Sequence, residues 1–425
     1  MGGHSREILR LAVPSIVSNI TVPLLGMVDT TIVGHLGDAA YIAAISLGGT
    51  AFSVLYWLFA FLRMSTSGLV SQAFGAADEA RSADVMRKSL SLGLAISAAI
   101  LLLQAPLFRF VLLLTPARPD VLLPLRTYYG VCVWGAPAIL LSYCLSGWFI
   151  GRQDTRTPMF AAILQNVVNI LLSLFFVYRL GMSIRGVALG TVLGAWSGML
   201  FMLLRLGRPG HLQKSAHSIG WGRFFSINKD IFFRTLCLVA VTVYFTRAGS
   251  LQQPGVLEAN AVLMQLFMLF SFFMDGFANA GEALSGRFYG SRDARSLGRM
   301  IHTLFLWGGG MGAFFSFCYV VWGEWVLSVF TDQQAVLLTA HDYLPWIWAM
   351  PLAGFAAFLW DGVFIGLTRS RQMFVSMACA MLLFFALWFA LRTAWMNHAL
   401  WLAFDAYLLA RGTLQWYLYK KREAA

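Results

Sequence analysis

A single carboxylate lies deep inside the first long apolar segment of the chain. Residues 9–33 read LRLAVPSIVSNITVPLLGMVDTTIV, and Asp29 is the one acidic residue among them. A carboxylate within a membrane segment is costly unless it faces protein or water, so it commonly belongs to an ion or substrate pathway. Pro14 interrupts the same helix and lies on roughly the same side as Asp29. We interpret the segment as a bending helix with a titratable group; the alternative is a polar residue at the membrane interface.

Uncharged polar residues occur at helical spacing in the neighbouring apolar segments. Asn169 and Ser173 are four residues apart in QNVVNILLS and therefore share one face of a helix. Around one carboxylate, such groups could line a small hydrated cavity, whereas each alone could be a hydrogen bond between helices. The candidates for this N-terminal polar cavity are Asn19, Thr30, Ser142, Ser146, Asn166, Asn169, Ser173 and Thr191.

The second half of the chain has acidic candidates of its own. Asp275, Glu282 and Asp361 lie in apolar segments, and each could take part in ion coupling. A structural alternative is pairing of Glu282 with Arg287 and of Asp275 with Arg247. Arg63 is interpreted as the only clearly intramembrane cation.

The composition is that of a multi-pass membrane protein. Of 425 residues, 59% are hydrophobic and 12% charged, whereas soluble domains carry about 25% charged residues. About twelve apolar segments place both termini on one side. The net charge of +12 is scattered over short connections, which does not favour a nucleic-acid partner. Signatures of soluble catalytic sites and of ATP binding are absent, so we expect no enzyme and no cofactor.

Basic residues predict the orientation and a repeat predicts the domains. With the termini inside, 23 of 31 Lys and Arg residues fall on the cytoplasmic side and seven on the outside. The longest polar connection, 207–229, is expected to be a cytoplasmic linker between a six-helix lobe at 1–206 and another at 230–425. One constant offset between the halves aligns Gly147 with Gly362 and Tyr128 with Tyr343, which indicates parallel repeats with a substrate cavity between them.

Five motifs carry a resemblance that covers essentially the whole chain. They are LAVPSIVSNITVPLLGMVDTTIVGHLG (11–37), WLFAFLRMSTSGLVSQAFG (57–75), GRQDTRTPM (151–159), MDGFANAGEALSGRFYG (274–290) and LWDGVFIGLTRSRQM (359–373). The chain resembles the multidrug and toxic compound extrusion (MATE) family, in its DinF-type branch. The resemblance implies an all-α fold with two pseudo-symmetric six-helix bundles in a V. It also implies that Asp29 is the coupling carboxylate and Pro14 the kink that bends the first helix.

The same resemblance implies a function and its coupling ion. Members export bulky, mostly cationic amphipathic compounds in exchange for H+ or Na+. Ser146 and Ser173 stand where the family often has an Asn and an Asp, and the loss of a carboxylate weakens a sodium site. H+ is therefore favoured over Na+. We expect a monomer in the inner (plasma) membrane, with lipid and small organic molecules as partners. Alternatives are a lipid-linked saccharide flippase of the same superfamily and, less favoured, a membrane-embedded enzyme.

Overall fold

The computed structural model describes residues 2–34, 39–114, 118–206 and 218–423, which form helices joined by short connections. In these ranges there is no strand. Within these ranges, eleven helices are long and apolar enough to cross a membrane. The last of them, α15 (Ser370–Glu423), joins two helices across a break at Met396, where φ is 45° and ψ is −121°. The expectation of about twelve spans in an all-α membrane protein is thus confirmed.

The contacts divide the chain into two compact units. The N-unit comprises Val17–Trp221, and the C-unit comprises Met1–Ile16 together with Gly222–Ala425. α1 (Gly2–Gly34) therefore contributes its first half to one unit and its second half to the other. The described part of the predicted linker that precedes α10, residues 218–220, belongs to the N-unit, and 207–217 fall outside the described residues.

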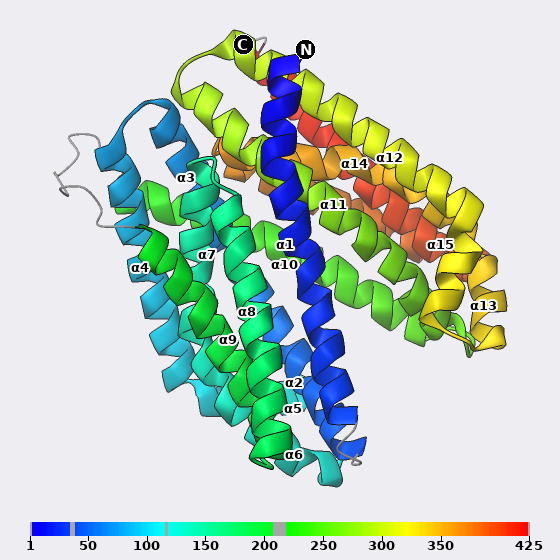
Figure 1. Ribbon diagram of the computed structural model, residues 1–425. Helices are drawn as coiled ribbons and strands as arrows, with labels where there is room; N and C mark the ends of the chain where they lie inside the picture. Colours follow the sequence, from blue (N-terminus) through cyan, green and yellow to red (C-terminus); the bar gives the residue numbers. More distant parts are fainter. Residues whose placement is uncertain (1, 35–38, 115–117, 207–217, 424–425) are drawn as a thin grey trace. The chain divides into compact units, whose positions relative to one another are not determined.

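The helices of each unit follow in chain order (Figure 1). In the N-unit they are α2 (Ala39–Leu58), α3 (Phe61–Gly75), α4 (Glu79–Leu102), α5 (Gln104–Leu114), α6 (Pro119–Cys132), a 3-10 turn (Val133–Gly135), α7 (Ala136–Gly151), α8 (Arg156–Leu174), a π-helical turn (Phe175–Arg179) and α9 (Ser183–Leu206). In the C-unit they are α10 (Trp221–Ser250), α11 (Val256–Gly290), α12 (Ala294–Phe330), α13 (Gln334–His341), α14 (Leu344–Gly366) and α15. The beginning of α1 and the end of α15 lie at the same end of the C-unit (Figure 1).

The start of α1 joins the C-unit through a glycine contact and an ion pair. A side chain at Gly276 on α11 would meet Ile16 and the backbone oxygen of Ala12, so only glycine lets the two helices come this close. The carboxylate of Glu7 lies 3.3 Å from the guanidinium of Arg287 at the end of α11. The first half of α1 is therefore packed on the C-terminal helices.

The predicted repeat is visible in the backbone. Gly147 on α7 lies against the backbone of Arg63 on α3, and Gly362 on α14 lies against that of Ala278 on α11. Both residues of the second contact follow those of the first by the offset that the sequence repeat predicts. The closely packed pairs α3–α7 and α11–α14 are therefore equivalent elements of the two units, in each of which a glycine lets two helix backbones touch.

The connections repeat as well. Asp78 caps α4 by accepting from the backbone N–H of Arg81 at 2.8 Å, and Asp293 caps α12 by accepting from that of Ser296 at 2.9 Å. The residues before these caps, Ala77 and Arg292, have positive φ angles of 54° and 58°. The same turn geometry at the same offset indicates that each half of the chain folds by one plan.

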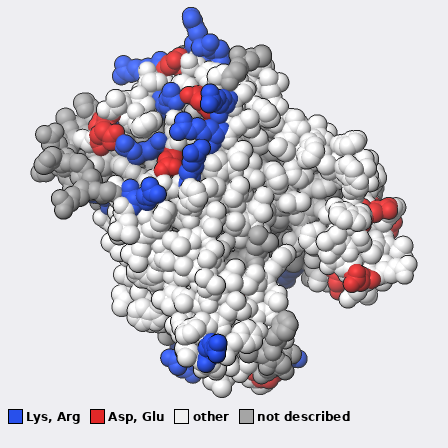
Figure 2. All heavy atoms as spheres, in the orientation of Figure 1, with Lys and Arg blue, Asp and Glu red and all other residues white. Residues whose placement is uncertain are grey.

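Charged side chains gather at the ends of the helices. On the face shown in Figure 2, each unit has a wide middle region without charge, and acidic side chains mark the end of the C-unit that carries α13. Two of the basic residues counted on the cytoplasmic side from the sequence, Arg234 and Arg411, lie buried within α10 and α15. They therefore do not indicate orientation, and the bias in basic residues persists without these two.

Candidate functional site

The N-unit holds a buried polar cluster around Asp29. Asp29 is 7% exposed on the second half of α1, and its carboxylate interacts with the side chains of Asn169 on α8 and Thr191 on α9. Among the described residues, its Oδ1 has no hydrogen-bond partner. A buried carboxylate with an open acceptor position favours a bound proton or cation.

A chain of hydrogen bonds fixes the groups that face Asp29. Asn169 donates from Nδ2 to Thr191 Oγ1 at 3.2 Å and accepts at Oδ1 from Ser173 Oγ at 3.1 Å. Gly190 lies against Ser173, so α8 and α9 pack closely enough to keep this chain together. The cluster is therefore held in place before any ion binds.

A second amide ties α8 to α1 beside the cluster. Asn166 donates from Nδ2 to the backbone oxygen of Thr21 at 2.9 Å. This bond lies between Pro14 and Asp29 on α1, next to Pro23. Since each proline removes one backbone hydrogen bond of the helix, α1 can bend on either side of this anchor.

The remaining N-terminal candidates lie apart from Asp29 or have other roles. Ser146 on α7 donates to Met202 Sδ at 3.5 Å, Thr30 is exposed and donates to the backbone of Gly26, and Asn19 is half-buried on α1. The structure thus brings together Asp29, Asn169, Ser173 and Thr191, with Asn166 at the edge. It does not place Ser146 among them.

Aromatic residues complete the surroundings of Asp29. Tyr128 and Cys132 on α6 lie near Asp29, and Tyr56 on α2 lies near Tyr128. These residues were not predicted as part of the site. The one relevant signal in the sequence was the match of Tyr128 with Tyr343 in the repeat, and such a match gives no information on which helix faces which.

In the C-unit, Asp361 is held in an ion cluster. Its Oδ2 accepts from Arg234 and, at 3.0 Å, from Arg411, while its Oδ1 accepts from Gln415 at 2.6 Å. Arg411 also lies 5.4 Å from the ring of Phe358. With two guanidiniums on one carboxylate, Asp361 is ionised. The interpretation of Arg63 as the only intramembrane cation was therefore wrong.

The other two C-terminal candidates lie on α11 and differ in exposure. Asp275 is exposed on α11 and interacts electrostatically with Arg411 of α15. Arg287, the expected partner of Glu282, forms an ion pair with Glu7. Glu282 itself is 1% exposed within α11.

Long apolar helices around a buried polar cluster define the class of a membrane transporter. In the described residues, no group of His, Cys, Asp and Glu could hold a metal ion. The chain matches the MatE family over residues 14–175 and 231–389, and it belongs to this family of transporters, which are not enzymes. It also matches the family "Lipid II flippase MurJ" over the shorter range 128–277.

Relatives and solved structures agree with this assignment. The chain is 37% identical to "DNA damage-inducible protein F" of Escherichia coli (strain K12), over 96% of this chain and 90% of that protein. It is 22% identical to "Multidrug export protein MepA" of Staphylococcus aureus (strain NCTC 8325 / PS 47), over 47% and 44%. The fold is similar to "Outward-facing conformation of a multidrug resistance MATE family transporter of the MOP superfamily", with a TM-score of 0.88, 18% identity and coverage of 99% and 96%. It is also similar to "Crystal structure of MATE in the bent conformation", with a TM-score of 0.86, 18% identity and coverage of 99% and 97%.

Proposed function

We propose that this transporter exports lipophilic, cationic organic compounds in exchange for protons across the inner membrane, with both termini in the cytoplasm. The observation that carries this proposal is Asp29, a buried carboxylate with an open acceptor position beside Asn169 and Thr191. The relatives named for multidrug export and resistance support the class of substrate.

The geometry suggests how proton and substrate compete. Without its proton Asp29 is a negative charge in an apolar unit, and a cation bound nearby lowers the cost of that charge. With its proton it is neutral and donates a hydrogen bond, so the attraction for a cationic substrate is lost. Binding of one ligand therefore weakens binding of the other, which is the requirement for antiport.

The polar cluster favours H+ over Na+. A sodium ion prefers several oxygen ligands and compensating charge, whereas Asn169 Oδ1 is already occupied by Ser173 and the hydroxyl of Thr191 donates to the backbone of Val187 at 3.0 Å. In this cluster, Asp29 is the one carboxylate that could bind the ion. A single carboxylate is sufficient to carry a proton.

Asp29→Asn tests this function. The amide keeps the shape of the side chain and cannot titrate, so the variant should fold and lose at least about 90% of pH-driven efflux, since the exchange step requires both protonation states. Efflux of ethidium from proteoliposomes under an imposed pH gradient measures this. Thr30→Val, which alters an exposed hydroxyl on the same helix, is the matched control. Efflux of Asp29→Asn near that of the control at equal protein content would exclude Asp29 as the coupling residue.

A flippase is the second candidate, and the match to the MurJ family over 128–277 favours testing it. The buried guanidiniums of Arg234 and Arg411 could meet a phosphate, but both already bind Asp361. Transfer of a fluorescent undecaprenyl-linked saccharide across vesicles, without any drug efflux, would support the flippase over the exporter.

A further inference from the structure

A buried acid on α15 has no role in the site described above. Asp405 is 8% exposed, and both of its carboxylate oxygens are buried without a hydrogen-bond partner among the described residues. Burial of an ionised carboxylate without donors costs several kcal/mol or more. Asp405 therefore carries its proton in this conformation.

None of the charged groups nearby accounts for Asp405. The helices that pack against this half of α15 are α14, α10 and α11, which contact it directly or through Phe404. None of the described charged or titratable groups of these helices and of the second half of α15 forms a hydrogen bond with Asp405; these groups are Arg223, Lys229, Asp230, Arg234, Cys237, Tyr244, Arg247, Glu258, Asp275, Glu282, Arg287, Tyr289, Asp361, His398, Tyr407, Arg411, Tyr417, Tyr419, Lys420 and Lys421. Asp361, one helix away, is by contrast saturated with donors.

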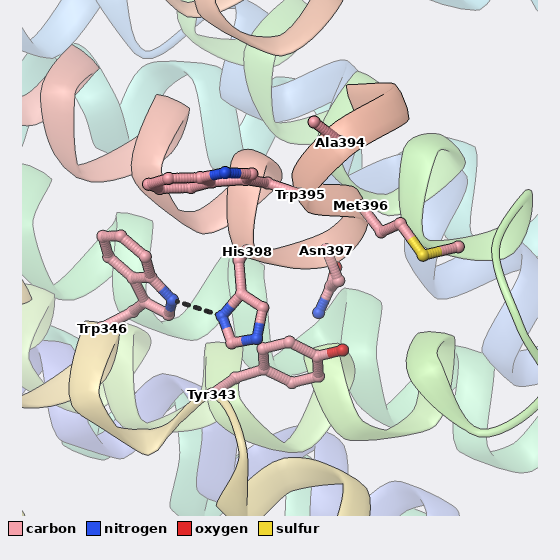
Figure 3. A pocket seen from close by; sticks show the side chains of 7 residues that line it. All are labelled: Tyr343, Trp346, Ala394, Trp395, Met396, Asn397 and His398. Carbon is pink, nitrogen blue, oxygen red and sulfur yellow. Dashed lines mark hydrogen bonds between the residues drawn. The ribbon is translucent and has the colours of Figure 1, made fainter. Parts of the chain in front are cut away.

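A pocket opens on the same face of α15, near its break. It measures about 470 Å³ and is lined by Tyr343, Trp346 and residues 394–398. Figure 3 shows that His398 points into it, with Trp346 donating from Nε1 to His398 Nδ1 at 3.1 Å. His398 precedes Asp405 by seven positions, which is two helical turns and an angular offset of about 20°. Asp405 thus lies on the same stripe of the helix as His398, about 10 Å farther along the helix axis than the pocket.

The break at Met396 allows the second half of α15 to move relative to the first half. Met396 has a φ of 45°, a conformation that residues with a Cβ rarely adopt. The residue after the break, Asn397, is fixed by hydrogen bonds with Asn260 at 2.8 and 2.9 Å. The second half of α15 is therefore a separate helix anchored to α11, and the pocket lies at the joint.

We propose that Asp405 is a second proton-binding site, in the C-unit, that exchanges its proton with water in the pocket at the α15 break. In the uptake step, a hydronium ion in the pocket passes its proton to water that enters at the break, and this water gives a proton to the carboxylate; an O–H bond forms on Asp405 and a water molecule is left at each point of transfer. Release is the reverse. The constant offset of the repeat pairs Asp405 with Gly190, which borders the Asp29 cluster, so the two acids lie in corresponding regions of their units. This inference rests on the proposed proton-coupled function.

Infrared difference spectroscopy of the purified full-length protein tests the site without any transport. The C=O stretch of a protonated carboxylic acid separates from the amide bands, and acid minus neutral spectra show each group that titrates. Asp405→Asn should remove one component and Asp29→Asn another. Asp361→Asn should remove none, because Asp361 is ionised in this structure. Superimposable spectra for Asp405→Asn and wild type would overturn the proposal, whatever the result for efflux.

Exchange with deuterium oxide tests the route. The Asp405 band should shift within the mixing time in the wild type and at least several-fold more slowly in Ala394→Trp, where an indole fills the exposed pocket. Equal shift rates in both proteins would exclude this pocket as the route. Ethidium-induced proton release from wild type in weakly buffered detergent should fall by about half in Asp405→Asn, by linkage. Absence of release from wild type, with the infrared band intact, would count against the proposed exporter but not against the proton site.

Discussion

Three buried aspartates differ in their partners, and so they should respond differently to the same substitution. Asp361 binds two arginines, Asp29 is partly satisfied, and Asp405 has no hydrogen-bond partner in the described chain. Loss of one member of a buried ion cluster leaves uncompensated charge, whereas loss of a neutral acid leaves little behind. The aspartate that stabilises the fold can therefore be distinguished by substitution from those that could carry a proton.

We expect Asp361→Asn to destabilise the protein by about 3–5 kcal/mol, because Arg234 and Arg411 then share a buried site without an anion. Asp405→Asn should change the stability by less than about 1 kcal/mol, because the acid it replaces makes no hydrogen bond. Thermal unfolding in one detergent measures both, and Asp405→Asn is the matched control for Asp361→Asn. Equal melting temperatures for the two variants would contradict the ion cluster.

The residues of the site could be predicted only where the local sequence was sufficient. Asp29, Asn169 and Ser173 are polar groups at helical spacing in apolar runs, and the structure places them together. Arg234 and Arg411 were counted only as basic residues of the cytoplasmic side, and no acidic partner was predicted for them. Their partner Asp361 lies 127 residues from Arg234 and 50 from Arg411, and no local pattern carries such a contact.

At the level of helices, the repeat rests on close backbone contact. Gly366 on α14 lies against Glu282 and Ser285 of α11, and Gly151 occupies the equivalent place in the N-unit. Leucine at either position must push two helices apart. The expectation of parallel repeats from one constant offset is thus supported by the same contact in both units.

Gly366→Ala should destabilise the protein by about 1–3 kcal/mol, because the added methyl group meets backbone atoms that cannot move alone. Gly310→Ala on α12 is the control, since nothing lies within 4 Å of its added methyl group, and it should be neutral or stabilising by about 0.5–1 kcal/mol. Thermal unfolding of the two alanine variants compares them directly. A Gly366→Ala variant as stable as Gly310→Ala would show that the backbone contact does not require glycine.

The end of the described linker is attached to α4 by a buried ion pair. Lys88 Nζ lies 2.6 Å from Asp84 Oδ2 and 3.1 Å from Ser218 Oγ, and it also donates to the backbone oxygen of Ile219. Ser218 in turn donates to Asp84 at 2.9 Å. One lysine therefore holds residues 218–219 on the N-unit.

Lys88→Met should lower stability by about 1–3 kcal/mol, because Asp84 and the Ile219 oxygen lose their buried donor. The double variant with Asp84→Asn should recover part of the loss, since no unpaired charge remains. Arg87→Met, which removes an exposed arginine 3.8 Å from Asp84, should cost less than about 1 kcal/mol. Chemical unfolding in detergent measures the cycle; strictly additive losses would exclude a specific Lys88–Asp84 interaction.

For the whole molecule, the sequence predicted class and number of spans better than it predicted the division of the chain. Apolar length and composition determine a membrane span locally. The first sixteen residues nevertheless group with Gly222–Ala425, because Gly276 admits α1 and Arg287 binds Glu7. Such a contact depends on a helix in the other half of the chain, and the hydropathy of the first residues does not predict it.

The orientation of the chain in the membrane can be tested by cysteine labelling. Twelve spans place both ends of the chain on one side, and the beginning of α1 and the end of α15 do lie at one end of the C-unit (Figure 1). Most basic residues flank that side, and such residues remain in the cytoplasm during insertion. In a variant without native cysteines, Arg295→Cys in the first turn of α12 should react with a membrane-impermeant maleimide only in opened cells. Leu251→Cys, 77% exposed between α10 and α11, should react in intact cells. These sites are joined by the single span of α11, so labelling of both from the same side would refute the span, and reversed labelling would refute the orientation.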